Sequence, residues 1–345
     1  MSEQFLKLTT FGGERDRTGD RFTADALIDL YERHEIRYSL LLRGAEGFGL
    51  RHHLQTDRLL TLSEDLPVMS VAYDTPERID SILEDVEALA GHGLTTIERV
   101  PLAGEGLSST SIEEEAPDPA KLTILLGRKH KVDGRPAHIE VVETLKSSGV
   151  EGASVLLGVD GTVRGKRSRA RFFGANPDVP VMVVAVGATN GITKAVTRLS
   201  GLLPDALMTV ERVKILKRDG RLVDQMVLPA SGATMASDSW QKLTVYAGEQ
   251  TRHDGRPLHP QIVRRLRDAG AIGATTVRGI WGYHGDHEPH GDSIWSIRRR
   301  VPVVSVVIDE PARCLDWFEV INELTDDGGL VTVEKVPCLK QLPKG

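Results

Sequence analysis

The chain of 345 residues repeats one sequence pattern three times, and this triplication constrains its fold more than any other feature. The blocks KLTTFGGE, KLTILLGR and KLTVYAGE begin at Lys7, Lys121 and Lys242. Each repeat then closes with a related block, TTIERVPL, MTVERVKI or VTVEKVPC. The first two starts are 114 positions apart and the next two are 121 apart, and most of this difference falls between repeats. We therefore predict three similar domains of about 100 residues each.

The predicted repeats span residues 4–103, 120–217 and 240–340, and two linkers separate them. Residues 104–119 are polar, acidic and contain proline, as is typical of linkers. Residues 218–239 form a longer linker, in which we expect a short strand around RLVDQMVL. Linkers of this length can span a compact domain, so neighbouring repeats are free to pack together.

Periodicity predicts the same order of elements in each repeat. In repeat 1 the expected strands are 5–11, 37–44, 67–74 and 94–100, and the expected helices are 23–36 and 74–91. The strands alternate or are continuously apolar, whereas the helices carry apolar residues at helical spacing. The order β-α-β-β-α-β is that of the split βαβ or ferredoxin-like unit, an α+β fold with helices on one face of a four-stranded sheet.

Composition excludes several classes of protein. A formal net charge of −6 argues against a general nucleic-acid binder, which would carry a basic excess. The first residues form no signal peptide, and no apolar run approaches a membrane span, so we expect no insertion into a membrane. Two cysteines are too few for a disulfide framework. The sequence therefore predicts a cytoplasmic protein with reduced thiols.

The residues RGAEGFG from Arg43, followed by RLLTLSEDLPVMSVAYDTPERI, resemble the bacterial family called domain of unknown function 190, in the PII-like group. The resemblance covers repeat 1 nearly whole and repeat 3 well. Repeat 2 departs from it, with Thr162 and Val163 where repeat 1 has Phe48 and Gly49. PII-type proteins are ferredoxin-like trimers that usually bind an effector, often an adenine nucleotide, between subunits. The resemblance implies a non-enzymatic protein that binds a small anionic effector and regulates a partner, such as a membrane transporter, through its inter-strand loops.

Triplication within such a family implies that one chain supplies all three units. The protein would then be a monomer that acts as an intramolecular pseudo-trimer, and its assembly would not depend on concentration. Linking also frees the three clefts to diverge, so we expect fewer than three equivalent ligand sites. The alternative arrangement, three separate domains like beads on a string, is not excluded by the sequence.

Candidate ligand-binding residues lie mainly in the three loops between the second and third strands, residues 44–65, 158–178 and 279–300. Paired glycines begin each loop and provide either a turn or close access to the backbone for an anion. In repeat 2, RGKRSRARFF has the arginines of an anion-binding segment, although a solvated edge strand or acidic neighbours would explain them equally. The candidates are Arg43, Gly44, Gly47, Phe48, Gly49, His52, Arg167, Arg169, Arg278, Gly279, Gly282, Tyr283 and His287. A further glycine-bearing turn at 91–93 is a candidate phosphate contact, although the end of a helix would also explain it.

The segment GIWGYHGDHEPHGD of repeat 3 carries candidate ligands for a divalent metal: His284, His287, His290 and Asp292. Their spacing fits neither one face of a helix nor one face of a strand, so chelation would need a curved loop. The competing interpretation is a loop that contacts a ligand or partner, in which His52 and His287 would confer pH sensitivity. A metal-binding protein or metal-dependent enzyme and a ligand-free structural adaptor are therefore retained as alternatives. The chain contains no GxSxG, HExxH or Walker pattern.

Overall fold

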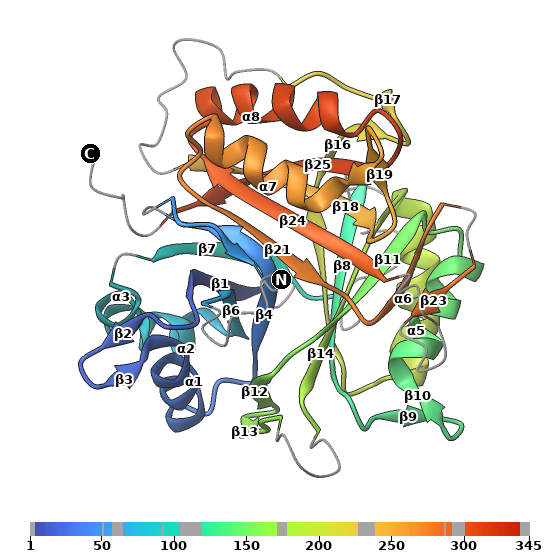
Figure 1. Ribbon diagram of the computed structural model, residues 1–345. Helices are drawn as coiled ribbons and strands as arrows, with labels where there is room; N and C mark the ends of the chain where they lie inside the picture. Colours follow the sequence, from blue (N-terminus) through green and yellow to red (C-terminus); the bar gives the residue numbers. More distant parts are fainter. Residues whose placement is uncertain are drawn as a thin grey trace, which may run out of the picture.

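The computed structural model describes residues 4–49, 52–56, 65–91, 93–103, 119–170, 178–226, 239–285, 288–291 and 301–338. Figure 1 shows three lobes that follow the chain, with repeat 1 in blue, repeat 2 in green and repeat 3 in orange and red. The long helices lie on the outside of the lobes, whereas the strands of all three lobes meet in the interior. Most of the acidic linker at 104–119 lies outside the described residues.

Each repeat has the predicted βαββαβ order, with short additional strands. Repeat 1 contains β1 (Gln4–Gly13), β2 (Arg17–Thr18), β3 (Arg21–Phe22), α1 (Thr23–Arg33), β4 (Tyr38–Phe48), β5 (Gln55–Thr56), β6 (Pro67–Asp74), α2 (Pro76–Asp80), α3 (Leu83–Ala90) and β7 (Leu94–Pro101). Repeat 2 and the chain after it contain β8 (Ala120–Gly127), β9 (Lys131–Val132), β10 (Arg135–Pro136), α5 (Ala137–Ser147), β11 (Gly152–Leu157), β12 (Asp160–Val163), β13 (Lys166–Arg167), β14 (Pro180–Gly187), α6 (Thr189–Leu202), β15 (Leu207–Arg212), β16 (Lys214–Arg218) and β17 (Arg221–Leu222). Repeat 3 contains β18 (Ser239–Gly248), β19 (Arg252–His253), β20 (Arg256–Pro257), α7 (Leu258–Asp268), β21 (Ala274–Arg278), β22 (Trp281–His284), β23 (His290–Gly291), β24 (Pro302–Asp309), α8 (Pro311–Leu324) and β25 (Leu330–Pro337).

The four main strands of each repeat form one antiparallel sheet with the same neighbours. The orders are β7-β1-β6-β4, β15-β8-β14-β11 and β25-β18-β24-β21. One face of each sheet packs against the helices of its own repeat, and the other face contributes to a shared cluster that includes Phe5, Leu125 and Val304. Because both faces of the sheets are buried, the strands β6, β14 and β24 are apolar almost throughout.

Strand pairing joins the three repeats in a closed cycle. The outer half of β4 pairs with β21 of repeat 3, β22 of repeat 3 pairs with β11 of repeat 2, and β12 of repeat 2 pairs with the inner half of β4. The residues directly opposite one another are Phe48 and Ala274, Tyr283 and Ala153, and Thr162 and Ser39. Their spacing along the chain is that of the three repeated lysines, so these junctions are three copies of one contact.

A second cycle of pairing closes the opposite edges of the sheets. Leu102 forms a bridge to Thr209 of repeat 2, β16 pairs with β25 of repeat 3, and Cys338 forms a bridge to Thr96 of repeat 1. The segment that follows the last main strand of each repeat therefore pairs with the next repeat, and the segment at the end of repeat 3 pairs with repeat 1.

The paired glycines lie where chains from two repeats approach each other closely. A Cβ atom at Gly47 would lie 2.5 Å from the Ala274 carbonyl oxygen, and one at Gly161 or Gly282 would clash with the opposite strand in the same way. Gly161 and Gly282 also have φ angles of +148° and +156°, which disfavour a side chain. In repeat 1 the prediction of a turn is wrong, because Gly44 and Gly47 both lie inside the continuous strand β4.

The second helix of repeat 1 also differs from the prediction of one helix over 74–91, because it is broken between α2 and α3. The Ser81 hydroxyl donates to the Arg78 carbonyl oxygen at 2.7 Å, and the Ile82 amide donates to the Ile79 carbonyl oxygen. A serine that bonds back to the preceding turn bends a helix. The equivalent helices α6 and α8 are continuous. Within the described ranges, none of the helices is long and apolar enough to cross a membrane.

Candidate functional site

A cleft of about 680 Å³ lies between repeat 1 and repeat 3. Repeat 1 contributes the end of β1 with the turn after it, the end of β4, and the turn between α3 and β7. Repeat 3 contributes the residues that lead into β21, Ile272 and Gly273, together with part of β24. The volume lies within the range of small-molecule sites, which occur preferentially between packed units.

Two carboxylates hold the turn after β1 in place. The Asp16 carboxylate accepts a hydrogen bond from the Gly13 amide at 2.6 Å, and the Asp65 carboxylate accepts one from the Arg15 amide at 2.9 Å. Arg15 and Arg17 line the cleft together with Asp16 and Asp65, and the Arg17 guanidinium lies 4.6 Å from the centre of the Phe22 ring. Guanidinium groups suit phosphate and carboxylate oxygens, so this wall can receive an anion.

The remaining lining of the cleft is largely apolar. It includes Phe11, Phe48, Leu94, Ile272, Val306 and Ile308. An apolar wall beside two arginines fits a ligand with a flat or apolar body and a negatively charged end.

Some of the residues predicted from the sequence come together at this cleft. Phe48 and Gly49 line it directly. His52 has a φ of +52° and stacks on Phe48, with ring centroids 5.8 Å apart, so it adjoins the cleft through that ring. The glycine-bearing turn at 91–93 also contributes lining residues.

Other predicted ligand-binding residues lie at the junctions between strands: Arg43, Gly44, Gly47, Arg278, Gly279, Gly282 and Tyr283. Arg43 contacts Glu14 at 2.9 Å, and at the equivalent place in repeat 3 the Arg278 guanidinium lies 2.8 Å from Glu249. The Tyr283 hydroxyl donates to the Val150 carbonyl oxygen at 2.7 Å. These contacts explain the residues through packing between repeats, and their role in ligand binding stays a prediction.

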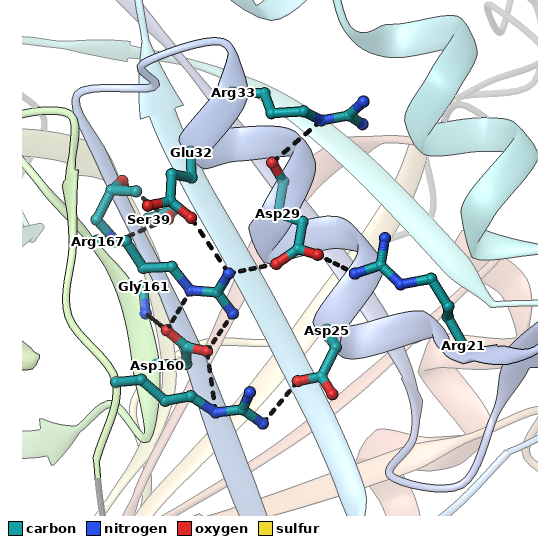
Figure 2. A network of polar contacts seen from close by, with 11 residues as sticks. Arg21, Asp25, Asp29, Glu32, Arg33, Ser39, Asp160, Gly161 and Arg167 are labelled. Atoms are coloured by element: carbon teal, nitrogen blue, oxygen red, sulfur yellow. Dashed lines mark hydrogen bonds and ion pairs between the residues drawn. The ribbon is translucent and has the colours of Figure 1, made fainter.

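Arg167 of repeat 2 lies against helix α1 of repeat 1, where it contacts carboxylates (Figure 2), and Arg169 pairs with the same helix. The Arg167 guanidinium binds both carboxylate oxygens of Asp160, at 2.6 and 3.0 Å, and also contacts Asp29 and Glu32 of α1. Arg169 contacts Asp25 at 2.8 Å. The observed contacts of Arg167 and Arg169 are ion pairs with acidic neighbours, which was one of the interpretations left open by the sequence.

The predicted metal ligands are only partly described. The His284 imidazole Nε2 lies 2.6 Å from the Asp219 carboxylate of the chain after repeat 2. His287 and Asp292 lie outside the described residues, and only the backbone of His290 is described, in β23. Within the described part of the chain, no group of three or more histidine, cysteine, aspartate or glutamate side chains could hold a metal ion.

The arginines of the cleft wall and the residues that repeat 3 contributes were not predicted from the sequence. A signal for the arginines was present, because the segment after the first strand carries Arg15 and Arg17 in repeat 1, Lys129 and Lys131 in repeat 2, and Arg252 in repeat 3. No comparable signal marks Ile272 or Gly273, since their position beside Phe48 depends on the pairing of Ala274 with Phe48 across the repeats.

Six buried charged residues from the repeated blocks meet at the centre of the molecule, in what we call the central ring. It consists of Lys7, Glu98, Lys121, Glu211, Lys242 and Glu334. Each lysine contacts the glutamate of its own repeat and that of one other repeat. Lys7, for example, lies 3.0 Å from Glu98 and 2.6 Å from Glu211. The alternating contacts close on themselves, so three positive and three negative groups balance.

The pKa values in the central ring reflect its alternating charges. Burial alone would raise the pKa of the Glu98 carboxyl, but the Lys242 and Lys7 ammonium groups outweigh burial and hold that pKa below its ordinary value of 4.5. The Glu211 pKa is lowered in the same way, and more strongly. Burial opposes the charged form of Lys7, yet the neighbouring carboxylates raise its pKa above the ordinary 10.5. The ring therefore favours its charged state, although it is removed from water.

Comparison with known proteins matches the chain three times to the model of one family, domain of unknown function 190, described as an uncharacterized ACR. The matches cover residues 5–102, 119–215 and 240–338. A UPF0166 protein of Aquifex aeolicus (strain VF5) is 30% identical over 97 residues, which are 28% of this chain and 90% of that protein. That relative is therefore matched by about one repeat.

Two solved structures resemble the chain weakly. A candidate glycine cleavage system transcriptional repressor has 9% sequence identity and a TM-score of 0.17, over 60% of this chain and 96% of its own. A candidate chlorite dismutase has 10% identity and a TM-score of 0.18, over 65% of this chain and 96% of its own. Likenesses of this size carry no information about function.

Proposed function

Since the chain belongs to the family of domain of unknown function 190, we propose that it is a PII-like effector-binding protein. It binds a small organic anion, with an adenine nucleotide as the leading candidate, in the cleft between repeats 1 and 3. It acts by binding rather than by catalysis, and its inter-strand loops transmit the occupied state to a partner protein. The partner class that the family resemblance suggests is a membrane transporter.

The observation that carries the proposal is the cleft itself. Its volume of about 680 Å³ can enclose a ligand of nucleotide size. Arg15 and Arg17 supply positive charge for a phosphate, and the apolar wall around Phe11 and Ile272 can pack against a base.

The proposal includes an intramolecular pseudo-trimer. The two closed cycles of strand pairing and the central ring support it, because each of them uses one contribution from every repeat. A single chain of 37.7 kDa should then sediment as a monomer at all concentrations. Three independent beads that trimerise with other chains would instead produce larger species as the concentration rises.

The test of ligand binding is titration calorimetry with ATP, ADP, AMP, adenosine and inorganic phosphate, each added alone. Arg17→Ala should weaken the binding of the phosphorylated ligands by about tenfold to a hundredfold, because a charge-assisted hydrogen bond contributes about 1.5–3 kcal/mol. Adenosine should bind the variant and the unsubstituted chain equally. Arg265→Ala is the matched control, since Arg265 of α7 pairs with Glu323 of α8 and does not line the cleft.

The remaining outcomes separate the alternatives. Failure of every nucleotide and of phosphate to bind would reject the anion-binding function and favour a ligand-free adaptor. Binding of zinc or manganese alone, abolished by His287→Ala, would favour the metal-binding alternative. Equal affinities in Arg17→Ala and the control would reject the assignment of this cleft.

A further inference from the structure

The repeated fold creates three spaces that correspond to the cleft, one at each junction between repeats. The positions can be matched through the strand registers, in which Phe48, Thr162 and Tyr283 are equivalent. Gly273 of the cleft then corresponds to Tyr38 at the junction of repeats 2 and 1, and to Gly152 at the junction of repeats 3 and 2. The three spaces can be compared position by position.

At the junction of repeats 2 and 1, a tyrosine takes the place of the cleft glycine. Tyr38 is buried, and its hydroxyl donates to the Asp205 carbonyl oxygen at 2.6 Å. Its ring belongs to the same packed cluster as Leu125 and Leu207, which are the counterparts of the cleft residues Phe11 and Leu94. The phenol ring therefore occupies the space that Gly273 leaves open between repeats 1 and 3.

Ion pairs hold this junction shut from outside. The β12–β13 hairpin of repeat 2 is held on α1 of repeat 1 by the contacts of Arg167 with Asp29 and Glu32, and by its two bonds to the buried Asp160 (Figure 2). Arg164 of the same hairpin also contacts Asp205 at 2.5 Å. Arg167 corresponds to His53, which lines the open cleft.

At the junction of repeats 3 and 2, the chain that follows β15 packs into the corresponding space. Val213 and Ile215 pack in one cluster with Leu330, the counterpart of Leu94, and with Tyr246, the counterpart of Phe11. Of the short strand expected around RLVDQMVL, the described residues contain β17.

The turn between β16 and β17 contacts three further counterparts of cleft residues. Arg218 contacts Glu151, the counterpart of Ile272, at 2.6 Å. Asp219 contacts His284, the counterpart of Gly49, at 2.6 Å. The Asp219 amide also donates to the carbonyl oxygen of Gly329, the counterpart of Gly93, at 2.9 Å.

We propose that the chain binds one effector rather than three, because its own side chains occupy two of the three equivalent clefts. The number of bound ligands rests on the proposed function. The geometry, in which one cleft is open and two are closed, is independent of that function. Triplication has then converted a symmetric set of sites into one site and two permanently closed junctions. The ligand at the open cleft has no second site to compete or cooperate with.

Cysteine labelling tests this closure without any ligand. Leu94→Cys, Leu207→Cys and Leu330→Cys place a thiol at the same position of the three junctions, and Leu94 lines the cleft while Leu207 and Leu330 are buried. With an uncharged maleimide and detection by intact mass, Leu94→Cys should react at least tenfold faster than the other two. The unsubstituted chain gives the background, because Cys314 and Cys338 are buried. Equal rates at the three positions, or protection of Leu94→Cys, would overturn the proposal.

A transplanted side chain provides the second test. Gly273→Tyr in the Leu94→Cys chain copies Tyr38 into the open cleft, where the nearest backbone atom would lie 3.2 Å from the new Cβ atom. It should slow labelling to the rate of Leu207→Cys and abolish ATP binding. A circular dichroism spectrum identical to that of the parent shows that the variant is folded, and rapid labelling of a folded Gly273→Tyr chain would contradict the proposal.

Titration with ATP completes the test. A stoichiometry of one per chain supports the proposal, and two or three per chain would reject it. If no nucleotide binds but the labelling remains selective for Leu94→Cys, the effector-binding function fails while the asymmetry of the clefts stands.

Discussion

The three repeats agree at the centre of the molecule and differ at their outer junctions. The central ring uses the same lysine and the same glutamate from every repeat, in the same contacts. The junction of repeats 1 and 3 has a glycine and an open cleft, and that of repeats 2 and 1 has a tyrosine and an arginine–carboxylate network. The junction of repeats 3 and 2 has the β16–β17 hairpin. Contacts that close the assembly must fit one another, whereas each junction can diverge separately once the repeats share one chain.

The largest expected effect is the loss of one charge from the central ring. Glu98→Gln leaves Lys7 and Lys242 with a single glutamate partner each and an unbalanced buried charge. Its free energy of unfolding in urea should fall by about 3–5 kcal/mol. Glu143→Gln removes an exposed partner of Arg135 and should leave the unfolding free energy nearly unchanged, and an equal loss in both variants would refute the distinction between centre and surface.

A methyl group at a crossing of two repeats should have the next largest effect. Gly161→Ala places a Cβ against the Ser39 carbonyl oxygen at a φ of +148°, and the combined clash and strain should cost on the order of 3 kcal/mol in urea unfolding. The comparison within the same repeat is Gly201→Ala, in helix α6, where the added methyl meets open space. That variant should be more stable by up to about 1 kcal/mol, and a loss of stability there would contradict this account.

Arg167→Ala tests the contribution of the ion pairs at one outer junction. It leaves the buried Asp160 carboxylate without its two-point partner and should lower the unfolding free energy by about 2 kcal/mol. Arg169→Ala, whose side chain is more exposed, should cost less. Nucleotide affinity should be the same in both variants as in the unsubstituted chain. A marked loss of affinity would instead support the anion-binding interpretation of these arginines.

The smallest expected effect is a change in the pH dependence of stability. The pKa values of Glu98 and Glu211 are lowered in the folded state. Their contribution to the stability of the fold is therefore present above about pH 4.5 and is lost as the pH falls through the lowered pKa values. Because the pKa of Lys7 is raised, its contribution is present below about 10.5 and is lost as the pH rises through the raised value. The difference in melting temperature between the unsubstituted chain and Lys7→Met/Glu98→Leu should therefore be flat from about pH 5 to 10. A slope within that window would contradict the assigned charges.

Local patterns were enough to predict the elements of each repeat, since periodicity reports which face of a strand or helix is buried. They failed where a single side chain interrupts the pattern, as Ser81 does between α2 and α3. The glycine pairs were visible as a repeated feature of the sequence. The second residue of each pair is a glycine because a backbone carbonyl oxygen of the neighbouring repeat leaves no room for a Cβ atom. A pattern along one strand carries no information about which carbonyl oxygen from another repeat will face it.

The candidate site was predictable only in part for the same reason. Phe48 and Gly49 were found because they mark a difference between repeats. Lys7 and Glu98 stood within the blocks that defined the repeat, yet a lysine in an alternating strand is ordinarily expected to face solvent. Their burial follows from the meeting of three sheets, which no single repeat encodes.

The pairing of β4 with β21 has a consequence for synthesis on the ribosome. Gly47 lies opposite Thr275, so the outer half of β4 emerges about 230 residues before its partner, a delay of roughly 10–45 s at ordinary rates of translation. During that interval repeat 1 presents an unpaired strand edge that can be captured by another nascent chain. Rapid synthesis of repeat 3 should therefore protect this edge more effectively than a chaperone. A pause before repeat 3 would prolong the exposure of the edge.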